Sequence, residues 1–476
     1  MINYLKNPLI NYTLLIGLIF ILIILKIGSF HMRLWDESIF AVNTFEMLEN
    51  GQYFSLYYNG SPDLFNTKPP LLNWLQILSV QLLGYNEFAL RLPSGLAAGG
   101  TVLVLFTFLK QYFSLHYAWI AALILLSAPG FIGYHTARTG DTDSLLTFML
   151  TLSILQFLSF LMNQNKSAVY WTMFFLTLAF LTKLHAAFLF LPAYLFILII
   201  QKKLKTFFMN VQFLLGILTF IGVCGTVLYI RELQTPGYFT QIIFKDAGRL
   251  FHEFDTHGGP FYFYLDKLFS QRYGWWMICF LGGLLLTVMN KKCKERIVLI
   301  PLLIMVFTYL LIISFSATKL IWYDMPLYPL LAIVSAFPIV YFLNHLGIQS
   351  RQSSFIVGVF FFYPLFLMFR TSQNNSIEIG DRRVEANEMF LYEAFKFNRN
   401  MDNVKVLYHG WNGSLLFYKY KFSTINQHIE LHTDLEAIKK GDRVLVKDLK
   451  LIEHLRRNFH LTELSRGEYA RMYRLE

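Results

Sequence analysis

About eleven long apolar runs constrain the fold of this chain more than any other feature of its sequence. A helix needs roughly 20 apolar residues to cross the hydrocarbon core of a bilayer. The runs that reach or approach this length lie at about 9–27, 88–109, 117–134, 144–162, 168–182, 186–200, 211–230, 274–289, 297–316, 325–343 and 354–369. Only 15% of the 476 residues are charged, whereas soluble domains carry about 25%. The sequence therefore predicts a polytopic α-helical membrane protein with about 11 to 13 spans.

Charge and cysteine content exclude several other classes of protein. The formal net charge is +11, but the basic residues fall largely in short loops between apolar runs. The positive-inside rule accounts for such an excess, so we expect a lipid bilayer and no nucleic acid as a partner. The three cysteines show neither a disulfide framework nor metal-ligand spacing. No small-residue cleavage site follows the first apolar run, which favours a retained membrane helix over a signal peptide.

Two basic loops predict the orientation in the membrane. One contains Lys202, Lys203 and Lys205, and the other contains several lysines and one arginine within 291–296. Both are expected in the cytoplasm, and counting spans from either loop places the N-terminus there as well. The expected membrane is the plasma membrane, which is the inner membrane of a bacterium. The same counting places on its outer side the segments 28–87, 135–143, 231–273 and 317–324 and the whole tail.

The composition changes near residue 370 and divides the chain in two. Residues 1–369 form the predicted membrane domain, in which 28–87 is a first external loop with a surface helix at 71–83. Residues 370–476 contain no spanning run and mix charges of both signs. We expect them to form a small extracytoplasmic α/β domain, with short strands at 404–408 and 444–446 and an amphipathic helix at 449–459.

The adjacent acids Asp36 and Glu37 follow the first apolar run. A carboxylate at the outer membrane interface is partly desolvated and can take a proton from an incoming hydroxyl. The same pair also suits the N-terminus of a following helix, where negative charge is favourable. Both interpretations, catalysis and helix capping, remain open from the residues alone.

Other isolated charges lie on the same predicted side. Lys68 precedes two prolines and is a point charge suited to phosphate, or else a lysine whose head reaches the interface. Arg138 is followed by Asp141 and Asp143, an Asp-x-Asp pair that can hold a divalent cation through oxygen ligands. Asp143 is equally a candidate N-cap for the next helix.

The last two external segments add further candidates. Arg249 and His257 lie in a polar, turn-rich loop, where the histidine is a metal ligand, a hydrogen-bond donor or a solvated side chain. Lys319 and Tyr323 lie in a short turn and supply cationic and hydroxyl donors suited to an anionic headgroup. The simplest inference is one site at the outer face.

Together these residues resemble the membrane glycosyltransferases that use polyprenyl-phosphate sugars, the group of 4-amino-4-deoxy-L-arabinose transferases and protein O-mannosyltransferases. The resemblance covers residues 30–330, and the pieces that carry it are Trp35, Asp36 and Glu37; Lys68, Pro69 and Pro70 with Leu71 and Leu72; the segment 86–94; Ala137, Arg138 and Thr139 with Asp143; His257 with Pro260, Phe261 and Tyr262; and Lys319 and Leu320 with Tyr323 and Pro326.

The resemblance implies a GT-C fold and roles for particular residues. It makes Asp36 the base and Asp143 the second acidic position, with Lys68 and Tyr323 near the donor phosphate. Two departures stand out: Thr67 replaces the glutamate that holds a metal in aminoarabinose transferases, and 38–40 differs from their Thr-Arg-Tyr. We therefore assign no cofactor and name no sugar. A divalent metal ion held by Asp141, Asp143 and His257 stays an open alternative.

The expected function is transfer of a sugar from a polyprenyl-phosphate donor to an extracytoplasmic acceptor, which is a lipid, a glycan or a protein, by an inverting displacement. Asp36, Glu37 and Asp143 are the expected catalytic residues, and the substrate-binding residues are Lys68, Arg138, Arg249, His257, Lys319 and Tyr323. The alternatives are a secondary transporter or lipid-linked-sugar flippase and a non-catalytic scaffold. Transporters place their charges near the bilayer midplane, whereas these charges gather at one face.

Overall fold

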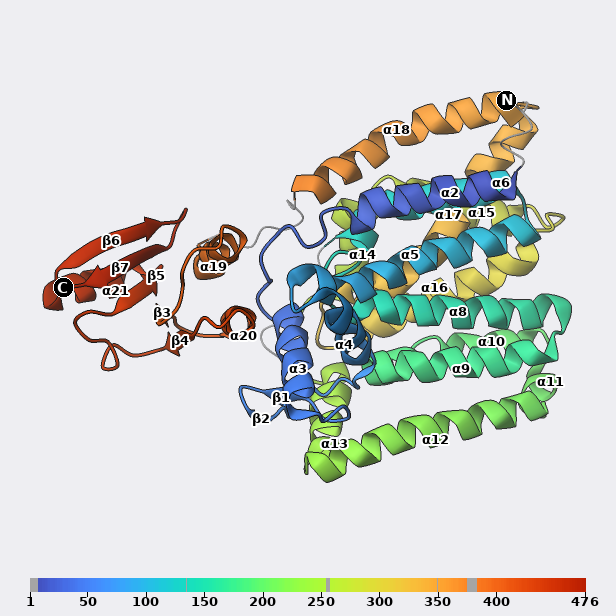
Figure 1. Ribbon diagram of the computed structural model, residues 1–476. Coiled ribbons are helices and arrows are strands. Elements are labelled where there is room, and N and C mark those ends of the chain that lie inside the picture. The colour runs from blue at the N-terminus through green and yellow to red at the C-terminus, as the bar shows by residue number, and fades with distance from the viewer. Residues whose placement is uncertain (1–6, 134, 254–256, 349, 375–382) are drawn as a thin grey trace. The chain divides into compact units, whose positions relative to one another are not determined.

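The computed structural model describes residues 7–133, 135–253, 257–348, 350–374 and 383–476 (Figure 1). The chain divides into two compact units. We call the first the helical unit; it comprises Met1–Leu25, Thr67–Leu72 and Ser94–Ile377. We call the other the sheet unit; it comprises Lys26–Asn66, Asn73–Pro93 and Glu378–Glu476.

The helical unit is built almost entirely from helices. The helices that lie entirely or mostly within this unit are α2 (Pro8–Ile19), η1 (Phe20–Ile24), α5 (Glu87–Tyr112), α6 (Leu115–Leu126), α7 (Pro129–Ile132), α8 (Thr142–Asn163), α9 (Lys166–Lys183), η2 (Leu184–Phe188), α10 (Leu191–Ile200), α11 (Leu204–Phe208), α12 (Val211–Gln234), α13 (Tyr238–Gln241), η3 (Ile242–Ala247), η4 (Gly248–Leu250), α14 (Phe263–Lys267), η5 (Leu268–Arg272), α15 (Trp276–Met289), α16 (Arg296–Phe315), η6 (Ile321–Leu327), α17 (Tyr328–His345) and α18 (Ser350–Asn374).

Each of the predicted apolar runs contains a helix, but not every helix is long enough to span. Among the described residues, 7 helices are long and apolar enough to cross a membrane, or up to 8 if the bent pair Phe263–Arg272 and Trp276–Met289 is one span. The helices at Pro8–Ile24, Leu115–Leu126 and Leu191–Ile200 are shorter. The predicted count of 11 to 13 spans is therefore not confirmed, because several runs stop or bend before a full bilayer thickness.

Close helix packing builds the core of the helical unit. Helix α9 packs against both α8 and α12, and α17 packs against α15 and α6. Glycine allows two of these approaches: a Cβ on Gly283 of α15 would lie 2.2 Å from the Val334 carbonyl oxygen of α17, and one on Gly216 of α12 would lie 2.5 Å from Met173 Cβ of α9. Small residues at helix contacts are typical of membrane bundles.

The sheet unit combines the N-terminal segments Lys26–Asn66 and Asn73–Pro93 with the C-terminal segment Glu378–Glu476. Its elements are α3 (Asp36–Asn50), the hairpin β1 (Tyr57–Tyr58) and β2 (Ser61–Pro62), most of α4 (Leu71–Leu83), α19 (Ala386–Lys396), β3 (Val404–Leu407), α20 (Gly413–Ser423), β4 (Ile429–His432), β5 (Arg443–Val446), α21 (Leu449–Asn458), β6 (Leu461–Arg466) and β7 (Arg471–Leu475).

The C-terminal strands form one mixed sheet in the order β4-β3-β5-β7-β6. Strand β3 is parallel to β4 and β5, whereas β7 is antiparallel to β5 and β6. Alternating Val404 and Val406 are buried, and α21 buries Ile452 and Leu455 against the sheet core. The predicted strands near 404–408 and 444–446 and the helix near 449–459 are present as β3, β5 and α21.

The buried carboxylate of Glu385 connects the C-terminal segment of the sheet unit to residues 31–34 of its N-terminal segment. The Glu385 Oε2 atom accepts a hydrogen bond from Arg33 Nη1 at 3.0 Å and lies 2.8 Å from His31 Nε2. Its Oε1 atom accepts from the Leu34 backbone N–H at 3.2 Å. Residue 385 thus fixes the backbone of 31–34, directly before α3.

Substitution of Glu385 is expected to change the acid stability of the protein. Burial alone would raise the pKa of Glu385, but the hydrogen bond and charge of His31 and the charge of Arg33 lower it from 4.5 to about 2. Because the folded-state pKa is the lower one, this carboxylate contributes stability above about pH 4.5 that is lost as the pH falls toward 2. Glu385→Gln should lower the apparent melting temperature at neutral pH by several degrees and flatten its decline over that window.

The control is Glu393→Gln, an exposed glutamate on the neighbouring helix α19. It should leave the melting profile unchanged. Equal profiles for Glu385→Gln and the wild type between pH 7 and pH 2 would show that the Glu385 contacts do not stabilise the fold.

Candidate active site in the helical unit

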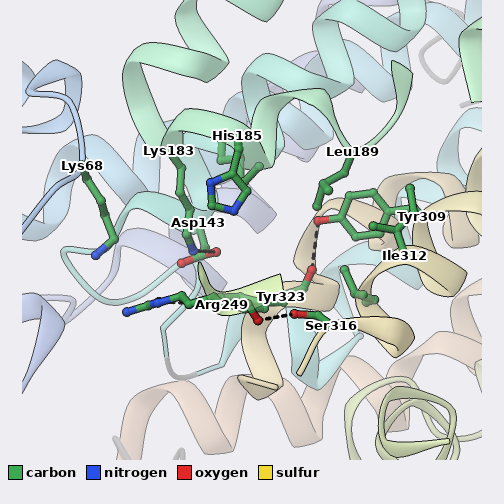
Figure 2. Close-up of a pocket in the computed structure, with 13 residues that line it drawn as sticks. Lys68, Asp143, Lys183, His185, Leu189, Arg249, Tyr309, Ile312, Ser316 and Tyr323 are labelled. Atoms are coloured by element: carbon green, nitrogen blue, oxygen red, sulfur yellow. Dashed lines mark hydrogen bonds and ion pairs between the residues drawn. The ribbon is translucent and has the colours of Figure 1, made fainter. Parts of the chain in front are cut away.

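A cavity in the helical unit gathers charged and apolar side chains from several helices (Figure 2). It encloses about 670 Å³ of space, part of it open to solvent. The described residues that line it are Lys68, Asp143, Leu146, Lys183, His185, Ala186, Leu189, Arg249, Tyr309, Ile312, Ile313, Ser316 and Tyr323. These residues come from distant parts of the chain, so the helix packing creates the site.

The polar wall of the cavity holds three cations and one carboxylate. Lys183 Nζ donates to Asp143 Oδ1 at 2.7 Å and lies 5.0 Å from the centre of the Tyr323 ring. Arg249 Nη1 donates to the Tyr323 hydroxyl at 2.8 Å. In Figure 2, Lys68, Lys183 and Arg249 surround the Asp143 carboxylate. The wall is therefore positively charged overall, which suits an anionic ligand such as phosphate.

An unusual backbone conformation places Lys183 at this wall. Helix α9 ends at Lys183, and the next residue, Leu184, has a φ of 39° and a ψ of −126°. Positive φ is a genuine outlier for a bulky residue that is not glycine. The break turns the chain between α9 and η2, and as a result both Lys183 and His185 line the cavity.

Two buried side chains hold the backbone next to Lys68. Arg231 Nη1 donates to the Lys68 carbonyl oxygen at 2.6 Å, and the Tyr238 hydroxyl donates to the Thr67 carbonyl oxygen at 2.7 Å. The Arg231 guanidinium also lies 4.0 Å from the centre of the Tyr238 ring. Since the proline at position 69 further restricts the backbone of Lys68, Arg231 and Tyr238 are positioning residues for the Lys68 side chain.

A second buried ion pair fixes the turn that carries Tyr323. Asp324 accepts hydrogen bonds from Arg272 at 2.9 to 3.1 Å and from the Tyr328 hydroxyl at 2.8 Å. The Tyr309 hydroxyl donates to the Tyr323 carbonyl oxygen at 3.0 Å. These contacts hold η6 in place and so orient the Tyr323 hydroxyl toward Arg249.

The chain matches known proteins along most of its length. The family model described as dolichyl-phosphate-mannose-protein mannosyltransferase matches residues 67–230. An uncharacterized protein of Aquifex aeolicus is 30% identical over 419 residues, which are 87% of this chain and 86% of that protein. The undecaprenyl phosphate-alpha-4-amino-4-deoxy-L-arabinose arabinosyl transferase of Pseudomonas savastanoi is 26% identical over 343 residues, which are 70% of this chain but only 61% of that protein.

The fold matches a solved structure as well. The crystal structure of ArnT from Cupriavidus metallidurans bound to undecaprenyl phosphate has a TM-score of 0.73 to this chain at 14% identity, and the match covers 97% of both chains. The chain therefore has the fold of the GT-C membrane glycosyltransferases. The predicted helical GT-C fold is confirmed without its span count, the predicted glycosyltransferase class is confirmed, and a transporter or flippase is not favoured.

Four of the substrate and catalytic residues predicted for this glycosyltransferase line the cavity: Lys68, Asp143, Arg249 and Tyr323. Their convergence does not depend on the resemblance, because the helix packing alone brings them together. Asp143 lies in the first turn of α8, as a helix N-terminus favours.

Three other predicted residues are not among the described lining residues. Arg138 donates to the carbonyl oxygens of Ile23 at 2.8 Å and Ser372 at 3.0 Å, among others, and so ties the end of η1 to α18. The Lys319 ammonium donates to the Ser316 carbonyl oxygen, and its burial lowers the pKa of Lys319. His257 is exposed, and its carbonyl oxygen accepts from the Lys319 backbone N–H at 2.7 Å.

The residues predicted to hold a metal have different surroundings. Asp143 pairs with Lys183, as described above, and His257 lies outside the described cavity lining. Asp141 Oδ2 lies 3.3 Å from His135 Nδ1, and the His135 ring stacks on Trp322 with centroids 3.7 Å apart. A metal ion bound by Asp141, Asp143 and His257 therefore stays a prediction, and no step below depends on one.

The predicted acids Asp36 and Glu37 belong to the sheet unit. Asp36 is the first residue of α3 and is partly buried. Glu37 is buried, and its carboxylate accepts from Arg91 Nε at 2.6 Å, from Arg91 Nη2 at 2.9 Å and from the Arg33 backbone N–H at 2.9 Å. Glu37 thus anchors the start of α3, and its catalytic role stays a prediction.

Sequence reasoning missed Lys183 and His185, which contribute a cation and an imidazole to the cavity. A signal was present: Lys183 and His185 lie in the short turn at 183–185, between the apolar runs 168–182 and 186–200. An ionisable residue between spanning segments is a functional candidate by default. The span count that placed the other charges outside also places this short turn there.

Loss of the buried ion pair between Asp324 and Arg272 should destabilise the protein strongly. Asp324→Asn leaves Arg272 without its counter-ion in a buried position, and breaking such a pair costs about 3 to 5 kcal/mol. The matched control is Asp266→Asn, whose side chain is 55% exposed and lies 3.9 Å from Lys267, because exposed pairs contribute about 1 kcal/mol or less. Denaturation in detergent measures both, and equal losses of stability would contradict this role for Asp324.

Proposed function

We propose that this glycosyltransferase moves a sugar from a polyprenyl-phosphate donor to an extracytoplasmic acceptor, which is a lipid, a glycan or a protein. The observation that carries the proposal is the cavity of the helical unit, in which Lys68, Lys183 and Arg249 meet one carboxylate beside an apolar wall. A lipid-linked phosphate has the same two parts, an anionic head and a hydrocarbon tail.

The polar wall suits the phosphate as a leaving group. The donor is a phosphodiester, and the released polyprenyl phosphate carries more negative charge at its phosphate oxygens. Lys68, Lys183 and Arg249 place cationic groups at this wall, and such groups stabilise the growing negative charge. The Tyr323 hydroxyl accepts from Arg249, and its own proton can therefore be donated to a phosphate oxygen.

The apolar wall suits the tail of the donor. Leu146, Leu189, Ile312 and Ile313 line the cavity and offer hydrocarbon surface to isoprenoid units. Two solved structures of similar fold support such a ligand: the Cupriavidus metallidurans ArnT is bound to undecaprenyl phosphate, and an archaeal oligosaccharyltransferase from Archaeoglobus fulgidus is in complex with a dolichol-phosphate.

In the proposed reaction, the acceptor hydroxyl gives its proton to the Asp36 carboxylate and its oxygen attacks the anomeric carbon. The bond from that carbon to the phosphate oxygen breaks, and polyprenyl phosphate leaves with the electron pair. One displacement inverts the anomeric configuration. A phosphate acceptor is already anionic, and Asp36 would then orient it instead of taking a proton.

The proposal includes the topology that the basic loops predict. The N-terminus and the loops at 202–205 and 291–296 face the cytoplasm, and the active site and residues 370–476 face the outside of a plasma membrane, the inner one in a bacterium. Apolar outer surfaces support the membrane setting, because only 17% of the apolar window of α12 and 11% of that of α18 is buried within the structure.

Two substitutions test the donor site, one at Lys68 and one at Tyr238, which holds the backbone next to Lys68. Lys68→Met should weaken binding of undecaprenyl phosphate about tenfold or more, which corresponds to about 1.4 kcal/mol. Tyr238→Phe removes one hydrogen bond to the backbone at Thr67, worth about 1 kcal/mol, and should raise the donor KM severalfold with little change in kcat. Titration of undecaprenyl phosphate into the protein in nanodiscs, together with steady-state kinetics, measures both.

The control for Tyr238→Phe is Tyr229→Phe, since Tyr229 lies on α12 with 60% of its surface exposed. Its kinetics should match the wild type. Unchanged lipid-phosphate binding in Lys68→Met would place the donor elsewhere.

A change at Asp36 tests the base. Asp36→Asn should reduce transfer to a hydroxyl acceptor by about 100-fold or more, because general-base catalysis contributes about 10²- to 10⁴-fold, while undecaprenyl phosphate still binds. In cells that carry this variant, mass spectrometry should find a polyprenyl-phosphate sugar that accumulates. The matched control is Glu49→Gln, an exposed acid near the other end of α3, and turnover by Asp36→Asn at the control's rate would remove Asp36 from the mechanism.

A further inference from the structure

Four aromatic side chains meet in the sheet unit, and we call Trp35, Tyr58, Phe65 and Trp411 the aromatic cluster. Trp411 lies at its centre: its ring centroid is 5.7 Å from that of Trp35, 5.3 Å from that of Tyr58 and 5.6 Å from that of Phe65. The Trp35 and Trp411 planes differ by only 16°. The cluster thus presents broad and nearly flat ring surfaces.

The cluster is not a closed core. Trp35 is 53% exposed and Phe65 is 52% exposed, although both pack against Trp411. Isolated exposed apolar side chains are ordinary, but exposed apolar groups gathered in one patch mark binding sites. The outer faces of this cluster are therefore available to a ligand.

The backbone at Trp35 points to the same conclusion independently. Trp35 has a φ of 73° and a ψ of −129°, which is an outlier for a large side chain. Its carbonyl oxygen is held by the Ser38 hydroxyl at 2.8 Å and by the Ile39 N–H at 3.1 Å. Strained residues that are held this firmly cluster at functional sites, and this strain turns an indole toward solvent.

Hydrogen-bonding groups lie directly beside the rings. Trp411 and Asn412 follow β3, at the carboxyl end of the parallel part of the sheet, an edge where α/β sheets commonly bind ligands. The Tyr58 hydroxyl donates to Asn412 Oδ1 at 2.8 Å, and Asn412 Nδ2 donates to the Tyr408 hydroxyl at 3.0 Å. Aromatic faces are thus combined with amide and hydroxyl groups at their edges.

We propose that the aromatic cluster binds a neutral sugar ring of the acceptor. One face of a pyranose presents C–H bonds, which fit the electron-rich face of an indole, and its hydroxyls fit the amide and hydroxyl groups of Asn412 and Tyr408. The four cluster side chains carry no charge, which favours a neutral sugar over an anionic one. The inference rests on the proposed function. Because Trp35 directly precedes Asp36, the proposed base that takes the acceptor proton, we assign the sugar bound here to the acceptor.

Saturation-transfer NMR on the full-length protein in nanodiscs tests the cluster. The probes are three neutral trisaccharides, built from glucose, from mannose and from N-acetylglucosamine. At least one should receive saturation at its ring C–H protons. Trp35→Ala and Trp411→Ala should each weaken the signal about fivefold, as expected for loss of one aromatic contact, whereas Trp35→Phe keeps a ring and should retain most of it.

The control is Phe397→Ala, because Phe397 lies in the same unit and is 61% exposed but is not part of the cluster. It should leave the signal unchanged. If Trp411→Ala fails to fold, Trp35→Ala decides the result. No saturation of any trisaccharide, or equal signals from Trp35→Ala and the wild type, would overturn the inference.

Lys68→Met separates this result from a failure of the proposed function. That variant should lose binding of undecaprenyl phosphate and keep the trisaccharide signal. A protein that binds the trisaccharide through Trp35 but does not bind undecaprenyl phosphate would refute the proposed donor and leave the sugar site standing. The reverse result would leave the donor site standing and refute the sugar site.

Discussion

The cost of placing charge among apolar helices governs the structure of the helical unit. A buried ion without a partner is strongly unfavourable, so ionised groups pair or bind backbone carbonyls. Asp324 pairs with Arg272, and Arg138 binds carbonyl oxygens. In the cavity, the described lining residues place Lys68, Lys183 and Arg249 near the carboxylate of Asp143. Such a cationic lining suits an anionic ligand.

The sequence predicted much of the helical unit because apolar runs are long and continuous. It did not predict the number of spans, since the ends and bends of helices such as α6 and α10 depend on packing. It placed Lys68, Asp143, Arg249 and Tyr323 on one face, and these residues do line one cavity. Position along a chain does not determine where a side chain points, however, so it could not separate them from Arg138 or Lys319. The backbone break at Leu184 was equally invisible.

The sheet unit was harder to foresee, because its contacts join residues more than 300 positions apart. Arg33 binds Glu385, and Glu87 binds Lys421, and no local pattern encodes either pair. Short apolar runs did predict the buried strands β3 and β5, and the amphipathic pattern predicted α21. The association of the segments 26–66 and 73–93 with the C-terminal segment comes from buried ion pairs and from aromatic contacts such as those of Trp411.

These contacts also distinguish the two adjacent acids. The Glu37 carboxylate accepts hydrogen bonds from the Arg91 guanidinium and from the Arg33 backbone N–H, so its charge is balanced inside the fold. That anchor fixes the first turn of α3, where the helix dipole stabilises negative charge on the neighbouring Asp36.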